Sequence, residues 1–188
     1  MLERSKLWPW LATAAVFILA AVALHLQGRF WRCTCGQIYL WAGDIWSSDN
    51  SQHLLDPYSF THILHGFVFF WLLAWGLPRL APAWQLCLAL TVEALWEVIE
   101  NSEFIIQRYR ETTLALGYQG DTIINSLSDI LLAGLGFMLA RQLGFRRSLA
   151  LFVITELVLL LWIKDSLILN VIMLLYPIEA IKAWQVGP

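Results

Sequence analysis

The chain has 188 residues, of which 59% are hydrophobic and only 14% are charged. Soluble domains carry about 25% charged residues, so this composition excludes an ordinary soluble fold and indicates a protein built for lipid. The net charge of −2 provides no basic surface, which argues against nucleic acid as a partner. The length suits one compact membrane domain over residues 1–188.

We expect an all-α fold, a polytopic membrane bundle of about five transmembrane helices plus an interfacial segment. The first span, 10–26, follows the basic residues Arg4 and Lys6 and therefore resembles a secretory signal. No cleavage site of small residues follows it, so we interpret it as a retained span.

A polar segment, 27–57, follows the first span. Its middle, 38–46, is aromatic enough to lie on the membrane interface rather than cross the bilayer. Cys33 and Cys35 in this segment are expected to be ordinary interfacial cysteines, with a disulfide or a pair of reactive thiols as the alternatives in an oxidising compartment.

Four further apolar stretches supply the remaining spans, which we place at 58–77, 84–99, 122–143 and 149–177. Pro78 and Pro82 bound a tight turn, which predicts an antiparallel hairpin of the second and third spans. The last stretch is too long for one upright span and is interrupted at Lys164-Asp165. It is either one tilted helix or a span followed by a re-entrant segment.

Basic residues lie on both sides of this predicted bundle. The side with the short turns would hold Arg4, Lys6, Arg79, Arg141, Arg146 and Arg147. Because short loops weigh most in the positive-inside rule, we favour that side as cytoplasmic.

Polar side chains gather at one end of three consecutive spans. In chain order they are His62 and His65, then Glu93, Glu97 and Glu100, then Asp121, Asn125, Ser128 and Asp129. Spacings of three and four place each set on one face of its helix. Consecutive spans alternate in direction, so the start of the second, the end of the third and the start of the fourth lie on the same side of the membrane. The pattern predicts one polar, acidic pocket there, and His53 and Asp56 belong to the same side.

Small residues on two of these spans allow close helix contact. Gly66 follows the histidines of the second span, and Ala133-Gly134-Leu135-Gly136 forms a patch on the fourth. Because glycine has no Cβ atom, the backbone of another helix can approach closely at these glycines.

The predicted pocket supports several chemistries. His62, His65, Glu97 and Asp121 are a plausible ligand set for a divalent zinc, manganese or iron ion. Alternatively, clustered carboxylates raise one another's pKa and provide a general acid and base beside a histidine. Polar residues also cross-link membrane helices without doing chemistry, but buried carboxylates of like sign repel one another unless they are protonated or bound to a cation.

The chain resembles an uncharacterised family of bacterial inner-membrane proteins, catalogued as a domain of unknown function. The motifs that carry the resemblance are Cys33-Thr34-Cys35-Gly36, Asn50-Ser51-Gln52-His53, His62-Ile63-Leu64-His65-Gly66-Phe67, Glu93-Ala94-Leu95-Trp96-Glu97, Gly120-Asp121 with Asn125 and Asp129, and Asp165-Ser166 with Asn170. The resemblance implies a multi-pass protein of the bacterial cell inner membrane, and it implies no activity. A looser architectural similarity to VanZ-like membrane proteins rests on a His at the start of one helix, Glu on the next and an Asp-x-x-x-Asn step on a later one.

The leading hypothesis is an enzyme that acts on a lipid or lipid-linked substrate by hydrolysis or group transfer. The candidate catalytic residues are His62, His65, Glu97, Glu100, Asp121, Asn125 and Asp129, and the candidate substrate-binding residues are Arg108, Arg110, His53 and Asp56. The guanidinium groups would hold a phosphate. Membrane lipids are the expected partners, and a divalent metal ion is the candidate cofactor. A protein that binds or transports cations or protons, and a non-catalytic membrane assembly partner, remain as alternatives.

Overall fold

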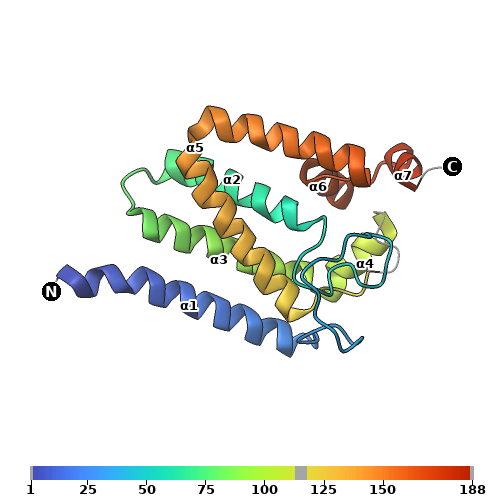
Figure 1. Cartoon of the computed structure of the whole chain (residues 1–188), viewed down its shortest axis with the longest axis horizontal. Helices are drawn as coiled ribbons and strands as arrows, with labels where there is room; N and C mark the ends of the chain where they lie inside the picture. Colours follow the sequence, from blue (N-terminus) through green and yellow to red (C-terminus); the bar gives the residue numbers. More distant parts are fainter. Residues whose placement is uncertain (1, 113–117, 187–188) are drawn as a thin grey trace.

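A computed structural model describes residues 2–112 and 118–186 of the chain (Figure 1). The described residues form helices and no strand, which confirms the all-α expectation. In chain order the helices are α1 (Leu2–Leu26), α2 (Ser59–Gly76), α3 (Pro82–Glu100), α4 (Glu103–Thr112), α5 (Ile123–Ile163), α6 (Leu167–Leu175) and α7 (Glu179–Val186).

Among the described residues, three stretches of helix are long and apolar enough to cross a membrane, namely Leu7–Leu26, Ser59–Gly76 and Ile123–Ile163. This finding is consistent with a membrane protein. Helix α3 has 19 residues and lies antiparallel beside α2 (Figure 1), as the tight turn predicts, but it carries three glutamates. The count of about five spans stays a prediction.

Helix α5 bends sharply at Gly144. This residue has φ 72° and ψ 170°, a conformation that glycine adopts without the steric cost that other residues have. Figure 1 shows the second arm of α5 turning back across the bundle. Trp71 of α2 donates from Nε1 to Ser148 Oγ at 2.9 Å, and Ser148 Oγ donates to the carbonyl of Gly144. The bend is therefore tied to the neighbouring helix.

The second arm of α5, which follows Gly144, ends at Ile163, whereas a single tilted helix over 149–177 would continue to residue 177. Lys164 adopts a left-handed conformation with φ 54°, and Ser166 then caps α6 by accepting from the backbone N–H of Leu169. One tilted helix is therefore wrong, because Lys164–Ser166 interrupt the helical backbone. Whether α6 re-enters the membrane stays a prediction.

Helices α2 and α5 cross at two glycines that face each other. A Cβ added at Gly66 would overlap the carbonyl oxygen of Ala133, and one added at Gly136 would overlap the carbonyl oxygen of Ile63. This confirms the close approach predicted from the small residues. Because the two backbones are in contact here, the part of α2 that carries His62, one turn before Gly66, and the adjacent His65 lies close to α5.

The polar segment between α1 and α2 folds over the start of α5. Carbonyl oxygens of Ser51, Phe30 and Trp31 accept the backbone N–H groups of residues 122, 123 and 124, at 3.1, 2.8 and 3.2 Å. The first N–H groups of a helix have no partner within that helix, so this loop supplies partners for them. The loop also closes Cys33 and Cys35 in a disulfide, one of the alternatives left open by the sequence.

Candidate functional site

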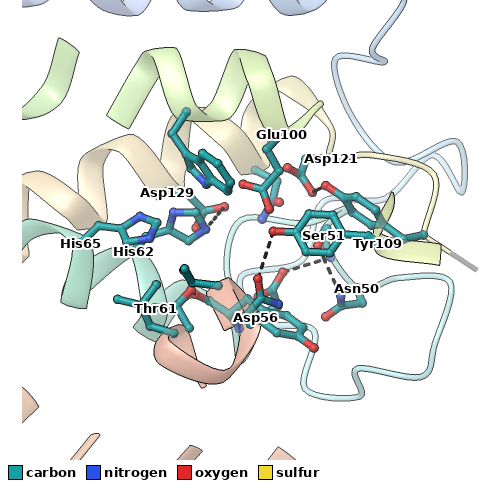
Figure 2. A pocket seen from close by; sticks show the side chains of 17 residues that line it. Asn50, Ser51, Asp56, Thr61, His62, His65, Glu100, Tyr109, Asp121 and Asp129 are labelled. Atoms are coloured by element: carbon teal, nitrogen blue, oxygen red, sulfur yellow. Dashed lines mark hydrogen bonds and ion pairs between the residues drawn. The ribbon is translucent and has the colours of Figure 1, made fainter. Parts of the chain in front are cut away.

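A polar cavity of about 70 Å³ lies where the start of α2, the end of α3 and the start of α5 meet (Figure 2). Its polar lining residues are Asn50, Ser51, Asp56, Tyr58, Thr61, His62, His65, Glu100, Tyr109, Tyr118, Asp121, Asn125, Asp129 and Asn170. The three helix ends that were predicted to converge do so, although Glu93, Glu97 and Ser128 are not among the residues that line the cavity. Its position at a membrane face stays a prediction. The volume is enough for several water molecules or for one small polar group.

Two histidines share one carboxylate at one end of the cavity. His62 Nδ1 lies 2.6 Å from Glu93 Oε1, and His65 Nδ1 lies 3.0 Å from both oxygens of Glu93. Glu93 is completely buried. A carboxylate that accepts from Nδ1 fixes the ring proton there and leaves Nε2 with a free lone pair. His62 Nε2 lies 3.9 Å from Asp129 Oδ2 (Figure 2).

Glu97 lies beside this pair without a hydrogen bond of its own. Its Oε1 is 3.3 Å from His62 Nδ1, but that nitrogen is closer to Glu93. Both oxygens of Glu97 and Oε2 of Glu100 are buried, and none of them has a hydrogen-bond partner among the described residues. A buried carboxylate without partners is costly in free energy, so this arrangement requires an explanation.

Asp121 and Asp56 at the opposite end are, by contrast, fully engaged. Asp121 accepts from Asn101 Nδ2 and from the Tyr118 hydroxyl, each at 2.8 Å. Asp56 accepts from the backbone N–H groups of Ser51 and Tyr58 at 3.0 and 2.7 Å. Burial raises the pKa of both carboxyl groups above the usual range, while these hydrogen bonds oppose the rise.

Helix α6 closes another side of the cavity. Tyr58 donates to Asp165 Oδ2 at 3.3 Å, and Tyr109 donates to Asn170 Oδ1 at 3.1 Å. Burial raises the pKa of Asp165 to about 6. Two tyrosines from other elements therefore position α6 against the cavity.

The comparisons with known proteins identify the family. A family model described as "Protein of unknown function (DUF2585)" matches residues 24–187. The chain belongs to this family. A relative named "UPF0314 protein" from Paracoccus denitrificans is 47% identical over 180 residues, which are 94% of this chain and 92% of the relative. Another "UPF0314 protein", from Sphingopyxis alaskensis, is 46% identical over 95% of both chains.

A further "UPF0314 protein", from Brucella anthropi, is 43% identical over 94% of this chain and 90% of the relative. No solved structure matches. The uncharacterised family expected from the motifs is thus confirmed, whereas the looser similarity to VanZ-like proteins is not shown.

Not all predicted binding residues of this DUF2585 protein reach the cavity. Arg108 donates from Nε to the carbonyl of Leu174 at 2.9 Å, and Arg110 donates from Nε to the carbonyl of Tyr118. Neither arginine is among the lining residues. Both guanidinium groups therefore hold neighbouring backbone in place, and their role toward a phosphate stays a prediction.

His53 also lies outside the cavity lining, buried in the loop. Its Nδ1 accepts from the backbone N–H of Tyr39 at 3.3 Å, and its Nε2 lies 3.8 Å from Asp49 Oδ1. The position of His53 is therefore suited to a structural role in the loop. Asp56, which we grouped with it, does line the cavity.

Within the part of the chain that the structure describes, three groups of side chains have ligand atoms close enough together to hold a metal ion, within 4.8 Å of one another. They are His62, His65 and Glu93; His62, Glu97 and Glu100; and Cys33, Cys35, Asp49 and His53. The third group cannot use its two cysteines while the Cys33–Cys35 disulfide is closed, because cysteine binds a metal through its thiolate. The structure separates Asp121 from the rest of the ligand set predicted from the sequence, which also contains His62, His65 and Glu97. Both oxygens of Asp121 already accept hydrogen bonds and are not free to bind an ion.

Sequence reasoning left Glu93 out of the candidate catalytic and metal residues. Its position four residues before Glu97 places it on the same helix face, and that spacing is the signal that could have included it. Ser51, Tyr109 and Tyr118, which the sequence did not indicate, also line the cavity. They lie in loops or short helices whose packing no local pattern indicates.

Proposed function

We propose that this protein is an integral inner-membrane enzyme that acts on a lipid or lipid-linked substrate by hydrolysis or group transfer. The observation that supports this function most is the geometry of His62. Its Nδ1 is held by Glu93 at 2.6 Å, while its Nε2 faces the cavity near Asp129. A histidine oriented in this way by a carboxylate is suited to act as a general base.

In the proposed reaction, His62 Nε2 takes a proton from water or from a substrate hydroxyl. The oxygen then attacks an acyl or phosphoryl centre, and the bond to the leaving group breaks. A carboxylic acid of the cavity returns a proton to the leaving group, and Asp129 is the nearest candidate, with Oδ2 at 3.9 Å from His62 Nε2. Glu93 positions both imidazole rings and stabilises the imidazolium that forms.

The position of the cavity supports a lipid as substrate. It lies at the ends of α2 and α5, both long and apolar enough to cross a membrane, which is the depth of lipid headgroups. Its wall includes the apolar side chains of Trp96, Leu167 and Val171 beside the polar ones. A volume of about 70 Å³ admits the reacting headgroup atoms, whereas acyl chains would stay in the surrounding bilayer.

Reconstituted protein tests this proposal. The wild type would be placed in vesicles of bacterial polar lipids, and the lipids and water-soluble products would be analysed by mass spectrometry over time. We expect a lipid to be consumed by the wild type and not by His62→Ala, whereas Leu161→Ala, which changes a side chain that is 87% exposed, retains the activity. Equal product formation by wild type and His62→Ala would refute the assignment.

A second candidate function is the binding or transport of a cation or of protons. The observation that favours it is Glu97, which is completely buried and has two unpartnered oxygens. Buried carboxylates in membrane proteins often carry protons or ions. Vesicles with an internal pH-sensitive dye would test this, because a carrier would dissipate an imposed ion gradient and Glu97→Gln would abolish that movement.

A further inference from the structure

The cavity contains an excess of buried acidic groups over basic ones. Its lining includes the carboxylates of Asp56, Glu100, Asp121 and Asp129, and no lysine or arginine is among the described residues that line it. The two histidines at its edge already face Glu93. The negative charge of this region is therefore compensated only by protons or by a bound cation.

The free acceptor atoms are not spread evenly over these acids. The oxygens of Asp121 and Asp56 accept hydrogen bonds from named donors, as described above. Both oxygens of Glu97 and Oε2 of Glu100 accept none, and Glu97 is completely buried. Among the carboxylates of this region, the buried oxygens without a hydrogen-bond donor therefore lie in the last two turns of α3.

His62 faces the same part of α3. One ligand atom of His62, of Glu97 and of Glu100 lie within 4.8 Å of one another. Ligand atoms at roughly 2.1–2.2 Å from one ion are separated by at most about 4.4 Å, so a small adjustment of side chains brings this triad onto one ion.

We propose that a divalent cation binds to His62, Glu97 and Glu100 at the α3 side of the cavity. Two carboxylates with a single imidazole favour Mn²⁺ or Fe²⁺ over ions that prefer sulfur ligands. Glu93 would orient the His62 ring from Nδ1 without binding the ion, which would bind to Nε2. A metal-bound Nε2 has no free lone pair, so the bound ion and the general-base step of the proposed reaction exclude each other.

The site lies in the same cavity as the proposed reaction, yet the binding of the ion does not depend on that reaction. It also differs from the set predicted from sequence. Asp121 is left out because its oxygens accept from Asn101 and Tyr118, and His65 is left out because its ligand atoms group with Glu93 rather than with Glu97 and Glu100.

Metal binding to purified protein tests the site. The full chain, produced without a histidine tag, would be stripped with a chelator in mild detergent, dialysed, and titrated with Mn²⁺ by calorimetry, with bound metal counted by mass spectrometry. We expect about one Mn²⁺ per chain for the wild type and at least about ten-fold weaker binding for Glu97→Gln and Glu100→Gln. Asp165→Asn, which changes a buried carboxylate outside the triad, should bind as the wild type does.

Folding of each variant would be checked by circular dichroism and gel filtration, and Glu97→Asp, which keeps the charge on a shorter side chain, provides a second variant with intermediate affinity. Absence of Mn²⁺, Fe²⁺ and Zn²⁺ from the wild type, or wild-type affinity in both glutamine variants, would overturn the site. Metal binding without lipid turnover by the metal-free protein would refute the proposed enzyme alone, and lipid turnover by a protein that binds none of these ions would refute the metal site alone.

Discussion

The crossing of α2 and α5 leads to a quantitative prediction, because the cavity depends on it. At Gly66 an added Cβ would overlap the carbonyl oxygen of Ala133 and lie 2.5 Å from the backbone nitrogen of Phe137. Both obstacles are backbone atoms of a helix, so no side-chain rotation can relieve the overlap. Gly66→Ala must therefore push the two helices apart.

Overpacking of this kind typically costs about 1–3 kcal/mol. For a protein of this size, 1 kcal/mol corresponds to roughly 2–4 °C in the unfolding temperature. We therefore expect Gly66→Ala to lower the apparent unfolding temperature in detergent by roughly 2–12 °C, and Gly136→Ala, which meets the carbonyl of Ile63, to act similarly.

The matched control is Gly76→Ala at the end of α2, where an added Cβ would meet nothing within 4 Å. Alanine there should be neutral or slightly stabilising, since it restricts the unfolded chain. Thermal unfolding followed by circular dichroism would measure all three variants. If Gly66→Ala unfolds at the same temperature as Gly76→Ala, the close crossing described above is incorrect.

Three further predictions concern the polar residues. Glu93→Gln removes the carboxylate that holds His62 and should cost about 1.5–3 kcal/mol, measured by thermal unfolding; wild-type stability would show that this contact does not exist. Asn101→Ala removes the donor to Asp121 Oδ2 and the acceptor of the Asp121 backbone N–H, so it should cost about 1–3 kcal/mol in the same assay, and an unchanged unfolding temperature would contradict these contacts. Because burial raises the pKa of Asp165 from 3.8 to about 6, its contribution to stability is present at pH 3–4 and is lost, by about 3 kcal/mol, as the pH rises to 7. The free energy of unfolding, measured from pH 4 to 7, should show this loss in the wild type and not in Asp165→Asn. The same dependence of the unfolding free energy on pH in both proteins would contradict the prediction.

Much of the arrangement could be predicted from the sequence because membrane helices are governed by simple rules. The apolar stretches indicate α1, α2 and α5, and the alternation of helix direction brings His62, Glu100 and Asp129 to the same end of the bundle. The helical period places the polar residues of each helix on one face. Neither rule requires knowledge of long-range packing.

The remaining features depend on contacts between segments distant in sequence. Gly144 interrupts a helix whose sequence is apolar on both sides, and the bend is fixed partly by Trp71 through Ser148. Arg108 and Arg110 point to carbonyl groups of α6 and of the segment before α5, which no local pattern indicates. Charge type alone therefore suggested phosphate binding, whereas the fold uses these side chains to join backbone segments.

The central claim is that the carboxylate of Glu97, which lies beside His62 without a hydrogen bond, is kept for function rather than for stability. The measurement is the apparent unfolding temperature of Glu97→Gln beside that of the wild type, both with a chelator present. Since no hydrogen bond to Glu97 is lost, we predict that the variant unfolds at the same temperature or a few °C higher. A decrease as large as that of Asn101→Ala would show that Glu97 holds the helices together and would contradict the claim.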